Sequence, residues 1–292
     1  MLIIATAMRY NAAAATLPLL LLLFETNLRG WRRYAAAVLA WVFTSVAAMT
    51  ASRALTEQKD HAWHSSVAIM DIVGTVRFTY FRDHNSDEDF ERLFQGTPLA
   101  VHKDILKSCR WWYTPYAHWS MSHGDRRIFD PPTTDAEREA IQALWWRLVT
   151  EQPSAYLRNR WEVFTHVVGD RPGALMEALW EGFVELPEQE KSVEVSTRHS
   201  ALQERWLEVH RWLADTFVFC PRFYFFIALL LIPFVRSRIS CAVLASGVCY
   251  ELGLFFVAPS ADVRYSHWMT VCTLVALVLI FVERIRRGRA SV

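Results

Sequence analysis

Apolar and polar residues alternate in long blocks along this chain, with two apolar runs near the amino terminus and three near the carboxyl terminus. The runs are Ala12–Phe24 extended back to Leu2, then Tyr34–Thr50, Thr216–Val235, Ile239–Val257 and Trp268–Val282. A helix needs about 20 mostly apolar residues to cross the hydrocarbon core of a bilayer. The pattern predicts an all-α polytopic membrane protein with about five transmembrane helices. It divides the chain into residues 1–51, 52–215 and 216–292.

The polar segment 52–215 contains little period-two alternation, so we expect helices and loops rather than a sheet. Asp135–Thr150 follows two prolines and two threonines, which is typical of a helix start. Ser154–Val168 is a second predicted helix, with its first residue as the expected cap. Four of its apolar residues are expected to form one face: Leu157, Trp161, Phe164 and Val168. Asp87–Phe94 and Leu202–Leu213 are predicted amphipathic helices, which makes the segment a large, mainly helical, aromatic-rich domain.

Charge is distributed unevenly, although the net charge is only +1. The polar segment holds 26 acids and 19 bases, whereas the remaining residues hold 12 bases and 4 acids. Nine arginines flank the apolar runs: Arg29, Arg32, Arg33, Arg236, Arg238, Arg284, Arg286, Arg287 and Arg289. Short basic loops stay in the cytoplasm, while large loops translocate regardless of charge. We therefore expect a cytoplasmic carboxyl terminus and an exoplasmic polar segment.

Several classes of protein are disfavoured by the same sequence. Four of the five cysteines lie in apolar runs, and Cys109 alone lies in the polar segment, so a disulfide framework is not expected. No cysteine or histidine spacing indicates a metal site, and we expect neither a metal nor another cofactor. The basic clusters are short and lie beside the apolar runs, so nucleic-acid binding is not expected.

Asp71 is the first candidate for chemistry, because it lies inside an apolar run that ends at Gly74. A buried carboxylate needs a partner. It could act as a general base, with the nearby His64 as a substrate contact. The alternative is a structural acid that pairs with Arg77 or caps a helix.

The second candidate is the turn before the last apolar run, which is expected to face outward at the membrane surface. Its polar residues are Asp262, Arg264, Tyr265 and His267. The planar fork of an arginine can donate two parallel hydrogen bonds to a lipid phosphate. The alternative is ordinary anchoring at the interface.

Two further features leave functional and structural readings open. Trp111 and Trp112 lie in an aromatic stretch broken by Pro115, and their rings could contact a sugar or fill a core. Glu251 is an acid well inside an apolar run, which marks a functional candidate by default. The alternative for Glu251 is pairing with Tyr250 or with a neighbouring helix.

Three short motifs resemble those of polytopic bacterial glycosyltransferases of the GT-C type and their relatives. They are Arg9-Tyr10-Asn11-Ala12 followed by Pro18-Leu19, Pro153-x-x-Tyr156-Leu157-x-x-Arg160, and Asp262-x-Arg264-Tyr265. The resemblance is to the carboxyl-terminal part of that architecture, since such enzymes usually have eight to thirteen spans.

The resemblance implies a protein of the bacterial inner membrane that is related to enzymes of cell-envelope glycan assembly acting on a polyprenyl-phosphate sugar, either as a transferase or as an incomplete or non-catalytic form. Arg9, Asn11, Arg264 and Tyr265 would bind the lipid phosphate. The family's catalytic acid lies in a first large exoplasmic loop near the amino terminus, so Asp71 does not inherit that role and is the candidate base only because transfer would need one. His64, Trp111, Trp112, Asp262 and His267 would contact substrate. The alternative is a non-catalytic scaffold or subunit that binds a protein partner through its exoplasmic domain.

Overall fold

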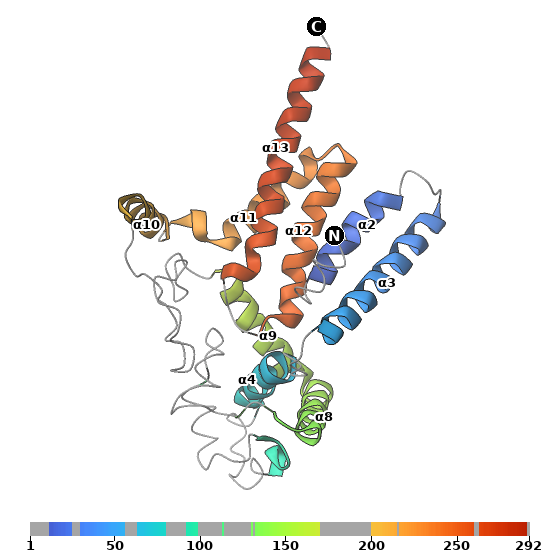
Figure 1. Ribbon diagram of the computed structural model, residues 1–292, viewed down its shortest axis with the longest axis vertical. Helices are drawn as coiled ribbons and strands as arrows, with labels where there is room; N and C mark the ends of the chain where they lie inside the picture. Colours follow the sequence, from blue (N-terminus) through green and yellow to red (C-terminus); the bar gives the residue numbers. More distant parts are fainter. Residues whose placement is uncertain are drawn as a thin grey trace.

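The computed structural model describes residues 12–24, 30–55, 63–79, 92–98, 113, 130, 132–169, 200–214, 216–259 and 263–290. Every regular element within these ranges is helical (Figure 1). Three helices are long and apolar enough to span a membrane: Trp31–Ala51, Arg238–Val257 and His267–Arg289. The prediction of an all-α protein is confirmed for the described residues, and three of its helices suit a membrane by length and composition. The count of five spans stays a prediction, because the other two apolar helices are shorter.

The spanning helices are α3 (Trp31–Leu55), α12 (Arg238–Val257) and α13 (His267–Ala290). The short α2 (Ala12–Phe24) packs against both α3 and α12, and α12 also packs along α13. Glycines allow these close approaches. A Cβ at Gly247 would lie 2.7 Å from the Cβ of Cys272 on α13, and one at Gly253 would lie 3.2 Å from the Cβ of Ala14. Small residues at helix interfaces are typical of membrane bundles.

Pro18 lies inside α2 and removes one backbone donor from that helix. Side chains of the neighbouring helices donate to carbonyls close to this point. Trp41 Nε1 of α3 donates to the carbonyl of Ala13 at 2.7 Å, and Ser246 Oγ of α12 donates to that of Ala15 at 2.7 Å. These bonds fix α2 between α3 and α12, since backbone groups in a membrane must be satisfied by protein.

The run Thr216–Val235 was expected to form one span, but the structure divides it into three pieces. A short η4 (Phe217–Phe219) precedes α11 (Pro221–Leu231), and η5 (Ile232–Phe234) follows it. Pro221 occupies the first turn of α11, where its missing N–H costs nothing, and the second proline of the run lies within η5. The regular α-helix is therefore only 11 residues long.

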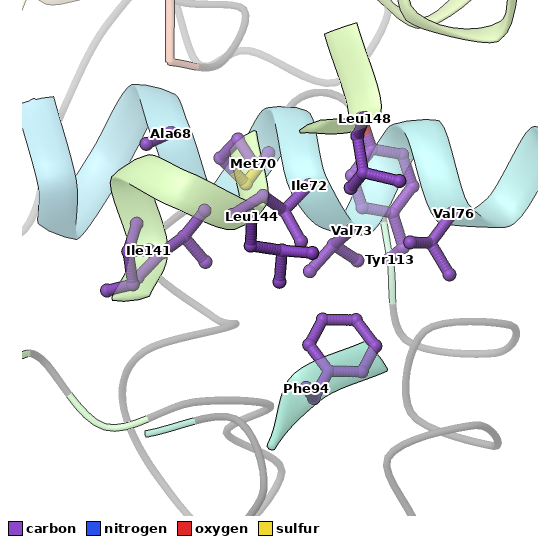
Figure 2. Close-up of a cluster of buried hydrophobic side chains, with 11 residues drawn as sticks. Ala68, Met70, Ile72, Val73, Val76, Phe94, Tyr113, Ile141, Leu144 and Leu148 are labelled. Atoms are coloured by element: carbon purple, nitrogen blue, oxygen red, sulfur yellow. The ribbon is translucent and has the colours of Figure 1, made fainter. Parts of the chain in front are cut away.

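The polar helices form a second layer at one end of α12, made of η1 (Trp63–Ala68), α4 (Ile69–Thr79), α8 (Asp135–Glu151) and α9 (Pro153–Val167) (Figure 1). Helix α4 is buried from its first residue to Val76, including the polar residues Asp71 and Thr75. Figure 2 shows its side chains against Ile141, Leu144 and Leu148 of α8, with Phe94 opposite.

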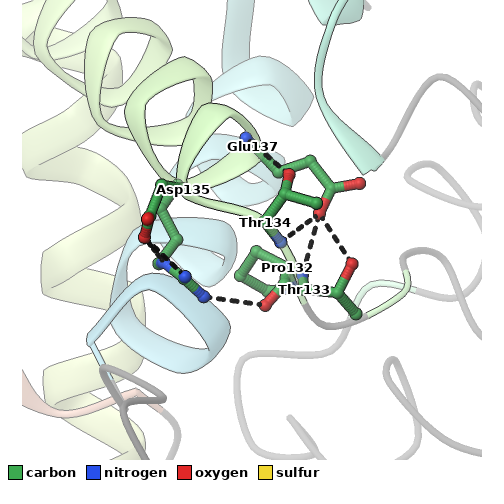
Figure 3. A network of polar contacts seen from close by, with 6 residues as sticks. Pro132, Thr133, Thr134, Asp135 and Glu137 are labelled. Atoms are coloured by element: carbon green, nitrogen blue, oxygen red, sulfur yellow. Dashed lines mark hydrogen bonds and ion pairs between the residues drawn. The ribbon is translucent and has the colours of Figure 1, made fainter.

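The start of α8 is a capping box (Figure 3). The amide of Glu137 donates to Thr134 Oγ1 at 3.2 Å, and the Glu137 carboxylate accepts from the amides of Thr133 and Thr134 at 2.8 and 3.0 Å. Two of the amide groups that a helix start leaves unpaired are thereby satisfied. The predicted start of Asp135–Thr150 is confirmed.

Helix α9 differs from the prediction in its start and in its buried face. It begins at Pro153, after Gln152, and Ser154 is not its cap. Leu157 and Trp161, expected on the apolar face, are exposed. The buried residues include the polar pair Asn159 and Arg160. The periodicity was misleading because two polar residues occupy the core-facing stripe.

Helix α9 also connects the polar layer to the membrane helices. Its residues Val163 and Val167 belong to a buried cluster that draws on α2 and α12. Phe164 makes an edge-to-face contact with Phe255 of α12, with ring centroids 5.8 Å apart. At its end, the carbonyl of Val168 accepts from the amide of Arg222 in α11 at 2.7 Å.

Candidate functional site

Asp71 lies in the first turn of α4 and is 1% exposed. Three side chains donate to its carboxylate. Arg160 of α9 forms an ion pair with Oδ2, to which Trp145 Nε1 of α8 also donates at 2.9 Å. Asn159 Nδ2 donates to Oδ1 at 3.3 Å. The carboxylate thus joins three polar-layer helices, and both of its oxygens are engaged.

The amide of Asn159 is oriented by a further hydrogen bond. Tyr113 Oη donates to Asn159 Oδ1 at 2.6 Å, which leaves Nδ2 to face Asp71. Gly74 makes room for this arrangement: a Cβ there would overlap Asn159 Oδ1 and would lie 2.7 Å from Tyr113 Oη. The glycine of the predicted apolar run is therefore explained by the close approach of α9.

Arg160 is 1% exposed and connects Asp71 to the membrane helices. While Nη2 faces the carboxylate, Nη1 donates to the carbonyl of Ala258 at 2.8 Å. Ala258 is the residue that ends α12. A cation is favoured at a helix carboxyl terminus, where the unpaired carbonyls carry partial negative charge. One guanidinium thus links the carboxylate of α4 to the end of a membrane helix.

Burial and pairing act in opposite directions on the charges of this network. Burial raises the pKa of Asp71, while the positive charge of Arg160 and the hydrogen bonds from Trp145 and Asn159 oppose that rise. Burial also raises the pKa of Tyr113, so its phenol keeps the proton that it donates to Asn159. The ion pair is desolvated and fully packed, so loss of either partner leaves a buried charge unpaired.

Arg77, which sequence reasoning offered as the partner of Asp71, pairs elsewhere. Its Nη1 lies 3.2 Å from Oε1 of Glu162, in a half-buried bridge between α4 and α9. Asp71 and Arg77 are six residues apart on α4, whereas side chains that meet on a helix are three or four residues apart. The two side chains therefore face different partners. The expected Asp71–Arg77 pair is wrong, and the reading of Asp71 as a paired acid holds with Arg160 instead.

His64 lies in η1 within an aromatic series that leads to the carboxylate. Its ring stands edge-on to Trp63 at 4.9 Å between centroids, and Trp63 stands edge-on to Trp145 at 5.2 Å. Trp145 is itself a donor to Asp71. His64 and Asp71 are therefore joined through two indoles, and substrate contact by His64 stays a prediction.

The turn before α13 contributes residues that contact α9. Tyr265 belongs to η6 (Val263–Ser266), is half-buried and packs against the cluster that contains Val163 and Val167. Arg264 lies in the same element. His267 opens α13 and is exposed. The D-x-R-Y and P-x-x-Y-L-x-x-R motifs, about a hundred residues apart in the sequence, thus meet at α9.

Glu251 is fully buried in α12 and accepts a hydrogen bond from Ser266 Oγ at 2.7 Å. Of the two structural alternatives offered for Glu251, the contact with a neighbouring helix is the one found. The acid is thus tied to η6 rather than to Tyr250.

Several predicted site residues lie outside the described part of the chain: Arg9, Asn11, Trp111, Trp112 and Asp262. Their roles stay predictions. Within the described residues, no group of three or more His, Cys, Asp or Glu side chains could hold a metal ion.

Sequence reasoning missed the partners of Asp71. Trp145 and Asn159 carry no motif of their own, and Arg160 appeared only as the last residue of the P-x-x-Y-L-x-x-R element. The usable signal was a polar pair in a predicted helix together with a glycine three residues after a buried acid. The partner of such a polar pair can be identified only when the positions of the helices in space are known.

Chemically, the network suits positioning better than proton transfer. A general base needs a free oxygen within reach of the proton that it removes. Both oxygens of Asp71 are occupied by donors, so proton abstraction would require the ion pair to open.

A scan against protein-family models and searches of curated proteins and of solved structures found no match for this chain.

Proposed function

We propose that this chain is an integral membrane protein that binds a polyprenyl-phosphate-linked sugar, in the manner of glycosyltransferases of cell-envelope glycan assembly. One observation carries the proposal: two of the motifs behind the glycosyltransferase resemblance meet at α9. Arg160 of the first motif donates to Ala258 at the end of α12, just before the outer turn. Tyr265 of the second packs against the same helix.

Arg264 and Tyr265 would hold the phosphate in this proposal, with Arg9 and Asn11 beside them. A guanidinium offers two parallel donors to a phosphate, and tyrosine adds a hydroxyl at the membrane surface. The aromatic residues Trp111 and Trp112, with Asp262, His64 and His267, would contact the sugar. Asp71 would act as a positioning residue that fixes α9, and its use as a base would require the ion pair to open.

The proposed location is the bacterial inner membrane, with the polar layer exoplasmic and the carboxyl terminus cytoplasmic. The distribution of arginines supports this orientation. Helix α3 begins, α12 begins and α13 ends at the end of the bundle that is remote from the polar layer (Figure 1). Arginines flank all three points, including Arg32, Arg238 and Arg287. Such asymmetry favours the basic end in the cytoplasm.

The test is saturable binding of a radiolabelled polyprenyl-phosphate sugar to the purified protein in nanodiscs. Wild type is expected to bind, and Arg264→Ala to bind at least roughly tenfold more weakly, as for loss of a charge-assisted hydrogen bond. Arg286→Ala, at the other end of α13, is the matched control and should bind as wild type does. Absence of binding by folded wild type, or equal binding by Arg264→Ala, would refute the proposal.

The second candidate is a non-catalytic scaffold whose polar layer binds a protein partner. Two tryptophans favour it, because Trp146 of α8 and Trp161 of α9 are each 61% exposed. Exposed tryptophans are enriched where proteins meet. A photo-crosslinking amino acid at position 161 should then yield one defined adduct in cells, and Arg264→Ala should leave it unchanged. A crosslinker at position 161 that finds no protein would exclude a partner on this face.

A further inference from the structure

Helix α10 (Ala201–Ala214) is strongly two-sided. Leu202, Trp206, Val209 and Leu213 recur at spacings of four, three and four, so they form one stripe along the helix. Glu204, Glu208 and Arg211 occupy the opposite side, as helical spacing requires. The helix therefore has a continuous apolar face and a charged face.

The apolar face of α10 is not buried by the described part of the chain. Leu202 is 67% exposed and Trp206 is 57% exposed, and Trp212 at the edge of the stripe is 73% exposed. An apolar stripe of this size is costly in water, where burial of apolar surface is worth about 25 cal/mol per Å². Some apolar environment must therefore cover it in the working protein.

The chain leads from α10 directly into an apolar helix. Thr216 caps the start of η4, because its side-chain oxygen accepts a hydrogen bond from the amide of Val218. Helix α11 follows at Pro221. In Figure 1, α10 is seen nearly end-on to the left of α11, whereas α12 and α13 run along the long axis of the view. Helix α10 thus lies crosswise to α12 and α13.

We propose that α10 is an interfacial helix that lies in the plane of the membrane, with its apolar face in the headgroup and acyl boundary of the lipid bilayer. Amphipathic helices with tryptophan on the apolar face and charge on the other bind membranes in this way. The inference is independent of lipid-linked sugar binding, since it needs only that α11, α12 and α13 sit in a bilayer.

The charges of α10 indicate how lipid is held. Glu204 and Glu208 are balanced by Arg205 and Arg211, so these four residues bring no net charge to the surface. Attraction to anionic lipid requires an excess of basic residues. The apolar stripe therefore carries the binding, and its depth is expected to be the same in zwitterionic and anionic bilayers.

The test measures the depth of two positions on α10 in the full-length protein in nanodiscs. A ketone-bearing amino acid, introduced by codon suppression and coupled to a nitroxide, replaces Val209 in one protein and Glu204 in the other, so the native cysteines stay intact. Electron paramagnetic resonance then measures how strongly two paramagnetic reagents enhance the relaxation of the nitroxide. Oxygen partitions into lipid, whereas a nickel chelate stays in water. Position 209 is expected to favour oxygen severalfold and position 204 to favour nickel.

Two results would overturn the proposal. Equal nickel access at both positions would place α10 in water, and shielding of position 209 from both reagents would mean that protein covers the stripe. If the label at 209 perturbs folding, seen as loss of helical circular dichroism, Leu202 on the same stripe replaces it with the same expectation. Repeating the measurement with zwitterionic and with anionic lipid should give the same depth.

Discussion

At the scale of single residues, the molecule depends on one buried pair of charges. Asp71 and Arg160 are each 1% exposed, and each forms a further hydrogen bond outside the pair. Pairs of this kind contribute little over apolar packing, but removal of one partner is costly because the other charge remains buried. The pair therefore constrains which arrangement of α4 and α9 can exist.

Asp71→Asn tests this asymmetry. The substitution keeps the shape of the side chain but leaves the guanidinium of Arg160 without its counter-charge, so we expect a loss of about 3–5 kcal/mol of unfolding free energy. Glu162→Gln, which breaks the half-buried bridge to Arg77, is the control and should cost no more than about 1 kcal/mol. Thermal unfolding in nanodiscs followed by circular dichroism makes the comparison, and equal losses would contradict it.

Gly74→Ala tests the close approach of α9 to α4. The added Cβ would meet Asn159 and Tyr113, so we expect destabilisation of roughly 1–3 kcal/mol, as for other overpacked sites. Gly288→Ala in α13 is the control, because nothing lies within 4 Å of its Cβ position. A stable Gly74→Ala protein with an unchanged unfolding midpoint would show that α9 is not packed this closely.

At the scale of elements, the start of α8 was predicted more accurately than the buried face of α9. The threonines before Asp135 predict the start of α8, and Thr134 forms a capping box there. The buried face of α9 was predicted from four residues: Phe164 and Val168 are buried, whereas Leu157 and Trp161 are exposed. Periodicity counts apolar residues, whereas α9 buries Asn159 and Arg160 because α4 offers them a carboxylate. A polar core of this kind depends on a contact between distant segments and cannot be read from one helix.

The cap of α8 predicts a pH dependence. Backbone hydrogen bonds from Thr134 and Thr133 lower the pKa of Glu137 below its ordinary value of 4.5. The stabilisation is therefore complete above that value and is lost as the pH falls through the lowered pKa. The difference in melting temperature between wild type and Glu137→Ala should be largest near neutral pH and should shrink in acid.

A matched variant separates the cap from general loss of charge. Glu139→Ala removes another carboxylate from α8 that makes no bond to the helix start, so its effect at neutral pH should be smaller than that of Glu137→Ala. Thr134→Ala should cost about 1 kcal/mol, the usual price of a lost cap. If Glu137→Ala and Glu139→Ala behave alike at neutral pH, the cap contributes nothing to stability.

At the scale of the whole molecule, the described helices of the polar segment pack at one end of α12, next to the long apolar helices. What joins the layers could not be predicted, because it rests on Arg160 reaching the backbone of Ala258. Every residue has a backbone carbonyl, so the sequence does not show which one accepts a hydrogen bond from a side chain. Asp71 and Tyr265 were named from the sequence as separate candidates, and their common contact with α9 became visible only in three dimensions.

Arg160→Lys tests the joint between the layers. Lysine keeps the positive charge but lacks the planar fork, so it cannot hold both the carboxylate and the carbonyl with the same geometry. Hydrogen exchange should become faster in α4 and α9 and should stay unchanged in α13. Arg158→Lys on the same helix is the control and should exchange as wild type does. Equal exchange rates in wild type and Arg160→Lys would rule out a joint at Arg160.

The contacts of α12 also set an order for biosynthesis. Helix α2 leaves the ribosome first, yet the hydroxyl that meets its Ala15 carbonyl belongs to Ser246, and Arg160 must wait for Ala258. Both early segments therefore remain incompletely bonded until α12 has been synthesised and inserted. A nascent chain stopped before α12 would present unmatched polar groups to the cell's membrane quality-control proteases, so expression of this protein depends on completion of its last third.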